Sequence, residues 1–417
     1  MSKRIEIEQK FYLESGEKFI EIIDANKFVL KENNTEVDEY FTDINSLYIK
    51  NRTCLRIRKT NDEIMELTFK GKSLEFNNFY AKTENNVDIN ISEYESLVSM
   101  LKSIGYLSYT IVDKKRYTYS KTIDDIEYNI MIDNIKGVGD FVEFEVLSND
   151  EYADVNDLKN KLNDFMKIFE EIKFQKANLP YRDFVAQKLY SNISCSDNIE
   201  CLMLDLDGTL IDSEKVFYTS FRDILKNEYN IEININDYVE NELNADTMLL
   251  KKLKESKKLS ENIDDKEVME KIYNDYKLKF EKLITSVDSI INFELLKKIK
   301  EKNIKLALIT TSKNDYIDIL KKNLNIDKIF DCIISRENVT KLKPSNEIYI
   351  KALNELNIKA ENCIAFEDSK KGIESAINAN INAIHINGYN LANYKLTNTY
   401  SIDYIQRVLL ILLNNIK

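Results

Sequence analysis

Two aspartates one residue apart follow an apolar run in the second half of the chain. The segment CLMLDLDG contains Asp205 and Asp207, and Gly208 follows them directly. In an extended segment these two side chains point to the same side, which suits a shared divalent cation and a phosphate. A carboxylate can attack phosphorus and form an aspartyl-phosphate, dividing one difficult displacement into two easier ones. Because nucleophile and phosphate are both anions, this chemistry needs a divalent cation and further positive charge.

Groups that could meet these needs follow later apolar runs. Thr310 and Ser312 follow the run LALI, Lys343 lies in KLKPSNEIY, and Glu367 and Asp368 end CIAFED. Short apolar runs that alternate with helical segments predict a parallel sheet buried on both faces, with ligands at the carboxyl ends of its strands. A lone D-x-D pair at a strand end is more often a turn or a cap. Four motifs in this order favour a catalytic site.

The order carboxylates, hydroxyl, lysine, carboxylates resembles the signature of the haloacid dehalogenase-like hydrolases over nearly all of residues 199–417. The resemblance implies an α/β Rossmann-like core with a helical cap at about residues 214–287. It implies Asp205 as nucleophile and Asp207 as acid–base residue. It also implies residues that bind the phosphoryl group, namely Thr310, Ser312 and Lys343. The implied Mg²⁺ ligands are Asp205, the backbone carbonyl of Leu206, Glu367 and Asp368.

Within this family the chain looks most like the phosphoglycolate phosphatase and β-phosphoglucomutase branch, a likeness that the SKN motif at 312–314 strengthens. Phe217 stands where the mutase pattern has a histidine. The resemblance therefore favours a phosphatase that acts on a small phosphomonoester.

Strand-like segments with charge at alternate positions make up most of residues 1 to about 188, with a few helices between them. RIEIEQKF places Glu6, Glu8 and Lys10 on one face of a strand and apolar residues on the other. Further charged positions with this alternation are Arg56, Arg58, Lys70, Lys114, Arg116, Glu143 and Glu145. Such faces either meet solvent, as in many antiparallel sheets, or line a closed barrel. In a barrel, the carboxylate pairs would bind a metal and the cations a polyphosphate.

Together these motifs resemble the CYTH domain, the family of triphosphate tunnel metalloenzymes and class IV adenylyl cyclases. The resemblance implies an α+β fold built on an eight-stranded antiparallel tunnel barrel. It implies Mg²⁺ or Mn²⁺ ligands at Glu6, Glu8, Glu143 and Glu145, with Asp133 nearby. It implies cations that grip a triphosphate, namely Lys10, Arg56, Arg58, Lys70, Lys114 and Arg116.

One segment departs from the family pattern, which leaves three activities open for this part of the chain. Where the family usually has Arg-x-Glu-x-Glu, residues 84–88 read ENNVD. The segment from Tyr40 to Arg58 resembles the class IV adenylyl cyclase branch. The alternatives are hydrolysis of an inorganic or organic triphosphate, cyclisation of ATP, and a catalytically silent module that senses polyphosphate and regulates the phosphatase.

Length and composition bound the remaining possibilities. With 417 residues we expect more than one domain, divided as 1–188, a linker at 189–198, and 199–417. A net charge of −12 argues against nucleic acid as a partner, and the absence of a long apolar run or leader predicts a cytoplasmic protein without a membrane partner. We expect small phosphorylated metabolites and a triphosphate or nucleotide as partners, while the composition does not indicate the oligomeric state.

Overall fold

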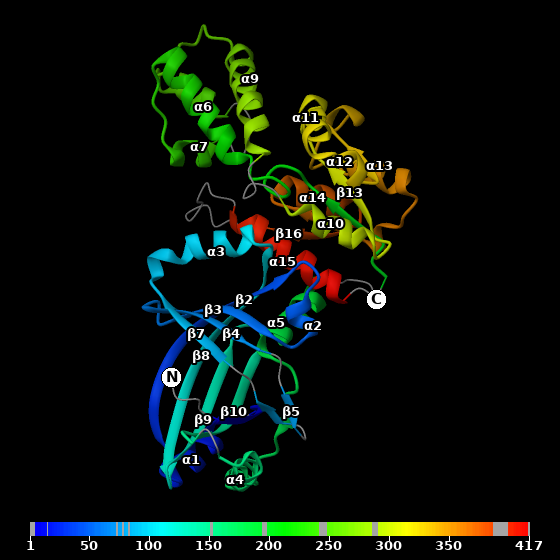
Figure 1. Ribbon diagram of the computed structural model, residues 1–417. Helices are drawn as coiled ribbons and strands as arrows, with labels where there is room; N and C mark the ends of the chain where they lie inside the picture. The colour runs from blue at the N-terminus through cyan, green and yellow to red at the C-terminus, as the bar shows by residue number, and fades with distance from the viewer. Residues whose placement is uncertain are drawn as a thin grey trace. The chain divides into compact units, whose positions relative to one another are not determined.

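In the computed structural model the chain forms two compact units, Met1–Ser191 and Asn192–Lys417 (Figure 1). The structure describes residues 5–14, 16–71, 74–76, 79–81, 84–150, 153–193, 198–241, 248–285, 291–386 and 399–415.

The first unit is built on an antiparallel sheet with the strand order β11-β1-β10-β9-β8-β2-β3-β4-β7. Its strands are β1 (Ile5–Tyr12), β2 (Val29–Asp43), β3 (Cys54–Thr60), β4 (Ile64–Lys70), β7 (Glu84–Ile89), β8 (Tyr106–Ile123), β9 (Ile126–Ile135), β10 (Gly139–Ser148) and β11 (Gln175–Lys176). The hairpin of β5 (Leu74–Phe76) and β6 (Phe79–Ala81) lies beside β1. The predicted antiparallel fold is confirmed, with eight longer strands and the two-residue β11 added at one edge.

Strand alternation gives this sheet one apolar face, which helices cover. Helices α1 (Glu17–Ala25) and α4 (Val155–Lys167) bury Phe19 and Leu162 against Phe144 of β10. Helix α3 (Tyr94–Ser103) buries Leu97 on the same face farther along the sheet. The remaining helical segments are α2 (Leu47–Lys50), η1 (Ile91–Glu93) and α5 (Tyr181–Ile193). Because successive side chains alternate, the charged residues of each strand share the opposite face.

The second unit contains a parallel sheet with the strand order β14-β13-β12-β15-β16, which confirms the predicted α/β fold. Its strands are β12 (Cys201–Leu204), β13 (Lys305–Ile309), β14 (Cys332–Ile334), β15 (Cys363–Glu367) and β16 (Asn382–His385). The helical segments around it are α10 (Phe293–Lys300), α11 (Asn314–Leu324), α12 (Ile326–Ile329), η3 (Arg336–Asn338), α13 (Glu347–Leu356), η4 (Ala360–Asn362), α14 (Lys370–Asn378) and α15 (Thr399–Asn415).

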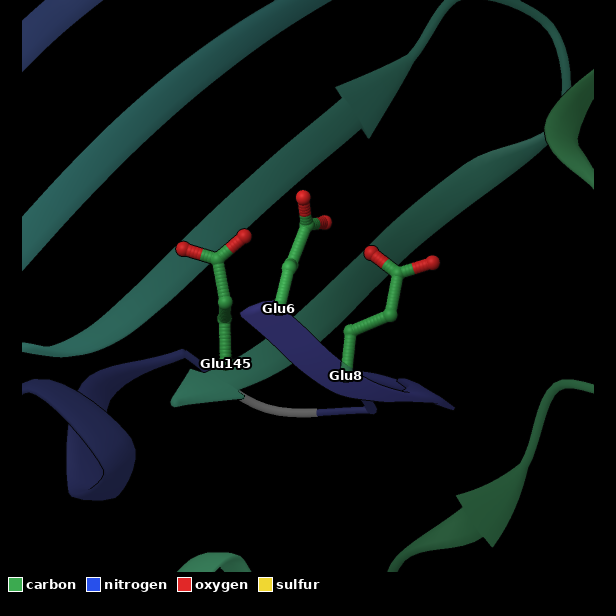
Figure 2. A group of neighbouring side chains, drawn as sticks. All are labelled: Glu6, Glu8 and Glu145. Atoms are coloured by element: carbon green, nitrogen blue, oxygen red, sulfur yellow. The ribbon is translucent and has the colours of Figure 1, made fainter. Parts of the chain in front are cut away.

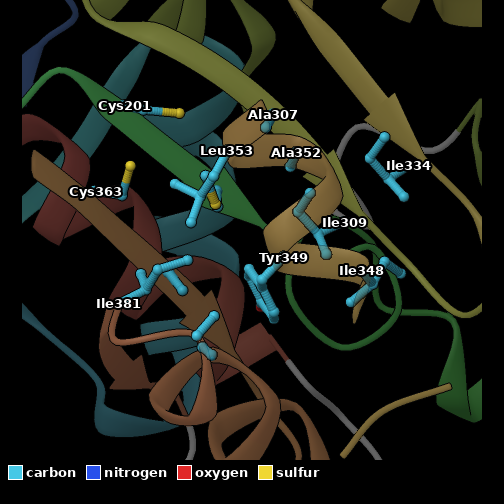
Figure 3. Packing of buried hydrophobic residues seen from close by; sticks show 14 of the residues in the cluster. Cys201, Ala307, Ile309, Ile334, Ile348, Tyr349, Ala352, Leu353, Cys363 and Ile381 are labelled. Carbon is cyan, nitrogen blue, oxygen red and sulfur yellow. The ribbon is translucent and has the colours of Figure 1, made fainter. Parts of the chain in front are cut away.

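Apolar packing holds the sheet of the second unit against its helices. Cys201, Ala307 and Cys363 of three neighbouring strands pack with Tyr349 and Ala352 of α13, as Figure 3 shows. All five residues are essentially inaccessible to water. This packing fixes α13, so that its side chains have set positions beside β15.

Four helices follow β12 and form an apolar cluster of their own. They are α6 (Glu214–Tyr229), α7 (Ile235–Asn241), α8 (Met248–Glu255) and α9 (Asp265–Leu283). Phe221, Tyr238, Leu250 and Ile272 are buried among them. These helices occupy the segment in which the sequence predicts a cap. In the part of the chain that the structure describes, no helix combines the length and apolarity that crossing a membrane requires.

Candidate functional site

Three strand ends meet at one edge of the parallel sheet of the second unit. Asp205 follows β12, Thr310 follows β13, and Glu367 is the last residue of β15. Because β12 lies between β13 and β15, their carboxyl ends are neighbours. The sheet therefore brings together predicted site residues that are far apart in sequence.

A group of three carboxylates lies at this edge. Asp205, Glu367 and Asp368 each offer an oxygen, and these oxygens all lie within 4.8 Å of one another. Lys343 Nζ lies 2.6 Å from both Asp205 Oδ1 and Glu367 Oε1. Burial, together with repulsion by Glu367, raises the pKa of Asp205 to about 8 against the opposing effect of Lys343. Burial and the charge of Asp205 also raise the pKa of Asp368. Among the described residues only Lys343 forms ion pairs with these carboxylates, which leaves the group short of positive charge.

Two glycines leave the space into which these carboxylates project. A β-carbon on Gly208, whose φ is +74°, would overlap the carboxylate of Asp368, and one on Gly372 would overlap that of Glu367. Glu367 Oε2 is buried and accepts no hydrogen bond within the described chain. Oxygen ligands of this kind suit Mg²⁺, so the residues present fit a divalent cation.

Asp207 lies apart from this group and is held by hydroxyl groups. Ser213 Oγ donates to Asp207 Oδ1 and Ser312 Oγ to Asp207 Oδ2, each at 2.5 Å. The Tyr276 hydroxyl of α9 lies 3.5 Å from Asp207 Oδ1. Ser312, which the sequence assigns to phosphate binding, therefore contacts the second aspartate in this structure. Its backbone N–H donates to Thr310 Oγ1 at 3.0 Å.

Sequence reasoning missed Ser213, Tyr276 and Tyr349 at this site. Tyr349 is fully buried on α13 and donates a hydrogen bond to Glu367 Oε1. Its place in KLKPSNEIY, near Lys343, was the one available signal. Ser213 directly precedes α6 and Tyr276 lies within α9, and neither carries a local pattern that marks it as a site residue.

The polar face of the antiparallel sheet holds a second group of three carboxylates. Figure 2 shows Glu6 and Glu8 of β1 and Glu145 of β10 directed to the same side. Glu8 stands directly opposite Glu145 in the β1–β10 register, a pairing of like charges that is destabilising without a counterion. The side chain of Glu8 is accessible to water from the polar face of the sheet. Its pKa is nevertheless raised to about 7, because the surrounding strands enclose the carboxyl group and Glu143 and Glu6 repel it. These hard oxygens also fit a divalent cation.

Glu143 lies outside this group because two cations hold it. Lys10 Nζ lies 2.9 Å from Glu143 Oε1, and Arg116 Nη2 lies 2.6 Å from Oε2. Although burial raises the pKa of Glu143, Lys10 and Arg116 outweigh it and keep the carboxyl ionised. The structure thus brings together three of the four predicted carboxylates and places the fourth among the cations.

Five of the predicted cations lie together on the polar face of the sheet, with carboxylates of β2 among them. This cationic wall consists of Lys10, Arg56, Arg58, Lys114 and Arg116. Arg58 donates to both oxygens of Asp38, from Nε at 2.6 Å and Nη2 at 2.7 Å. Arg56 Nη1 lies 3.5 Å from Asp38 Oδ2. Glu36 lies 3.0 Å from both Arg58 and Lys114. Sequence reasoning missed Glu36 and Asp38, although their i, i+2 spacing puts them on one face of β2.

Asp133 and Tyr181 complete the wall. Arg116 donates to both oxygens of Asp133, at 2.6 and 2.5 Å, and the Tyr181 hydroxyl donates to Asp133 at 2.7 Å. Lys10 Nζ lies 3.6 Å from the centroid of the Tyr181 ring. Lys70 is the sixth predicted cation. Its charge partly offsets the rise in the pKa of Glu8, so it lies near the carboxylate group.

The segment that departs from the CYTH pattern forms the edge strand β7. Asn86 pairs with Thr68, and Asp88 pairs with Glu66 of β4. Both Asn86 and Asp88 have exposed side chains, while the side chain of Glu84 lies outside the described residues. The altered positions thus belong to the rim of the sheet.

Two known protein families each match one of the two compact units of the chain. The CYTH domain family matches residues 4–181, and the haloacid dehalogenase-like hydrolase family matches residues 202–386. A phosphorylated carbohydrates phosphatase of Thermotoga maritima is 30% identical over 192 residues, which cover 45% of this chain and 84% of that protein. The chain is a CYTH domain joined to a haloacid dehalogenase-like hydrolase. Both families generally use divalent metals, and each unit offers one acidic group among its described residues.

Other proteins resemble one part or the other. A putative pyrophosphatase PpaX of Caldanaerobacter subterraneus is 26% identical and covers 49% of this chain and 89% of its own length. The β-phosphoglucomutase structure from Clostridium difficile is 25% identical, with a TM-score of 0.39, and covers 51% of this chain and 97% of its own. A putative adenylate cyclase structure from Vibrio parahaemolyticus is 20% identical, with a TM-score of 0.36, and covers 44% and 98%.

Replacing Gly372 by alanine should damage the hydrolase site without weakening the helix that carries it. Alanine is favoured over glycine in a helix by about 1 kcal/mol, but here its methyl group would overlap the carboxylate of Glu367. We expect Mg²⁺ affinity, measured by calorimetric titration, to fall by at least about 10-fold. Gly16→Ala is the control, since a β-carbon at Gly16 meets no atom within 4 Å. Unchanged Mg²⁺ affinity in Gly372→Ala would contradict the assignment of Glu367.

Glu8→Gln should separate metal binding from stability in the CYTH domain. The variant loses a metal-binding oxygen but also a charge that repels Glu145 across the β1–β10 pair. We expect one Mn²⁺-binding event to weaken at least about 10-fold while the melting temperature in EDTA stays the same or rises. Glu95→Gln, on the exposed side of α3, controls for charge. Full Mn²⁺ binding combined with a lower melting temperature would refute the site.

Proposed function

We propose that the chain is a bifunctional, metal-dependent phosphohydrolase. The hydrolase domain removes the phosphoryl group of a small phosphomonoester, and the CYTH domain hydrolyses an inorganic or organic triphosphate. The observation that carries this proposal is the presence, in each unit, of a group of three carboxylates beside lysine or arginine side chains. Each arrangement supplies ligands for a divalent cation and positive charge for a phosphate.

In the hydrolase domain Asp205 acts as the nucleophile and forms an aspartyl-phosphate. Asp205, Glu367 and Asp368 would hold a divalent cation, whose charge would offset theirs and polarise the phosphoryl group. Lys343 lies 2.6 Å from Asp205 and is placed to stabilise charge on the phosphoryl oxygens. Thr310, which is buried directly after β13, binds a phosphoryl oxygen through its hydroxyl group.

Asp207 protonates the leaving oxygen and then activates the water that cleaves the aspartyl-phosphate. The hydroxyls of Ser213 and Ser312 orient its carboxylate. Tyr276 belongs to an aromatic cluster of the helices after β12, with its ring centroid 5.3 Å from that of Phe217. This cluster covers one side of Asp207, which stays half-buried, as a cap over the site would. Because Phe217 has no titratable proton, the site favours hydrolysis over phosphoryl transfer within the substrate.

In the CYTH domain Glu6, Glu8 and Glu145 would hold the cation. The wall of cations binds the triphosphate, since Lys114 and Arg116 of β8 lie on the same face of the sheet as Lys10 of β1. A bound cation would polarise the terminal phosphoryl group for attack by water. Arginine pairs with phosphate oxygens in the bidentate geometry that Arg58 and Arg116 already make with carboxylates.

Single substitutions should separate the two activities in the full chain. Asp205→Asn removes the nucleophile, so we expect hydrolysis of p-nitrophenyl phosphate to fall by about 10³-fold or more while tripolyphosphate hydrolysis persists. Glu6→Gln should give the opposite pattern. Phosphate release assayed with both substrates measures each effect. Loss of both activities in either variant would contradict two independent sites.

Product analysis with ATP and Mg²⁺ or Mn²⁺ distinguishes the remaining alternatives for the CYTH domain. ADP with phosphate, or AMP with pyrophosphate, supports hydrolysis. Cyclic AMP with pyrophosphate would make this domain an adenylyl cyclase instead. Tripolyphosphate binding without turnover, combined with a change in phosphatase rate, would make it a sensing module.

A further inference from the structure

Glu36 is a carboxylate placed between cations that the proposed function assigns to the substrate. It lies on β2, between β3 and β8, and is 6% exposed. Its Oε2 atom is 3.0 Å from Arg58 Nη1 and 3.0 Å from Lys114 Nζ. Lys114 stands directly opposite Glu36 in the β2–β8 register, and Arg58 comes from the neighbouring strand β3. An anionic oxygen thus bridges two cations from opposite sides.

The carboxylate of Glu36 stays ionised in this position. Burial raises its pKa, but Lys114 and Arg58 outweigh burial and hold the pKa below its usual value. A negatively charged oxygen bridging an arginine and a lysine is also the arrangement that a phosphate oxygen adopts in a cationic site. Glu36 therefore imitates one anionic group of a polyphosphate.

Glu36 is not the residue that orients these cations. Asp38 of β2 is 1% exposed and accepts two hydrogen bonds from Arg58. Arg58 stands directly opposite Asp38 on the neighbouring strand β3. Lys114 has a second carboxylate, Asp133, at 3.7 Å. The wall can therefore keep its geometry without the charge of Glu36, which distinguishes Glu36 from Asp38.

We propose that Glu36 is an internal competitor that occupies a phosphoryl position of the cationic wall and lowers the affinity of the CYTH domain for polyphosphates. The inference rests on the proposed binding of a triphosphate in this domain. An incoming polyphosphate must displace the Glu36 carboxylate from Arg58 and Lys114 or bind beside it against its repulsion. Glu36 thereby sets the affinity, whereas Asp38 positions the arginines.

The test compares Glu36→Gln with wild type in the full chain. The ligand is diimidotriphosphate, a tripolyphosphate analogue whose bridging oxygens are replaced by NH groups to resist hydrolysis, titrated calorimetrically with Mg²⁺ present. We expect binding to become about 10-fold tighter or more, because a unit charge a few ångströms from a phosphoryl group is removed while the side chain keeps its size. Asp38→Asn should weaken binding instead, since Arg58 loses one of its two hydrogen bonds and the negative charge that holds it.

Glu95→Gln provides the charge-matched control. Glu95 is exposed on α3, away from the polar face of the sheet, so its substitution should leave affinity unchanged. If wild type binds the analogue and Glu36→Gln binds it equally or more weakly, with an unchanged melting temperature, the inference about Glu36 is overturned while the proposed function stands. If neither wild type nor Glu36→Gln binds the analogue, the proposed triphosphate function fails with it. A gain of affinity in Glu95→Gln of the same size would also overturn the role of Glu36.

Discussion

Repulsion between neighbouring carboxylates is the interaction on which both candidate sites depend. In the hydrolase domain Asp205, Glu367 and Asp368 crowd together in a buried place, and burial raises the pKa of Asp205 and Asp368. In the CYTH domain Glu8 stands opposite Glu145 on paired strands. Such arrangements cost free energy in the absence of a counterion, so their retention in a folded chain is best explained by a bound divalent cation.

The two units supply positive charge in different ways. The hydrolase site relies on Lys343, one lysine that contacts both Asp205 and Glu367. The CYTH domain distributes its cations over several strands and pairs them with carboxylates such as Asp38 and Glu143. A compact lysine suits a small phosphoryl group, whereas a broad wall of paired cations suits a longer polyanion, whose charges can replace the internal ones.

Sheet geometry explains how each site is assembled. In the parallel sheet the site residues come from the ends of strands, so Asp205, Glu367 and Asp368 meet at one short edge although they are far apart in sequence. In the antiparallel sheet they come from alternate positions along whole strands, so a broad face collects them. The apolar sides of the sheets, represented by Phe144 and Ala307, pack against helices and keep these surfaces in place.

The sequence by itself determined both fold classes, because buried parallel strands and half-buried antiparallel strands leave different periodicities. It also indicated that Asp205, Glu367 and Asp368 would meet, since each ends an apolar run. Only the tertiary structure decided which charges are neighbours. Alternation along a strand tells which face a residue takes, but its partners depend on strand order and register. For that reason Glu143 lies with cations instead of with Glu8. Glu36 meets its cations only because the strand order places β3 and β8 on either side of β2.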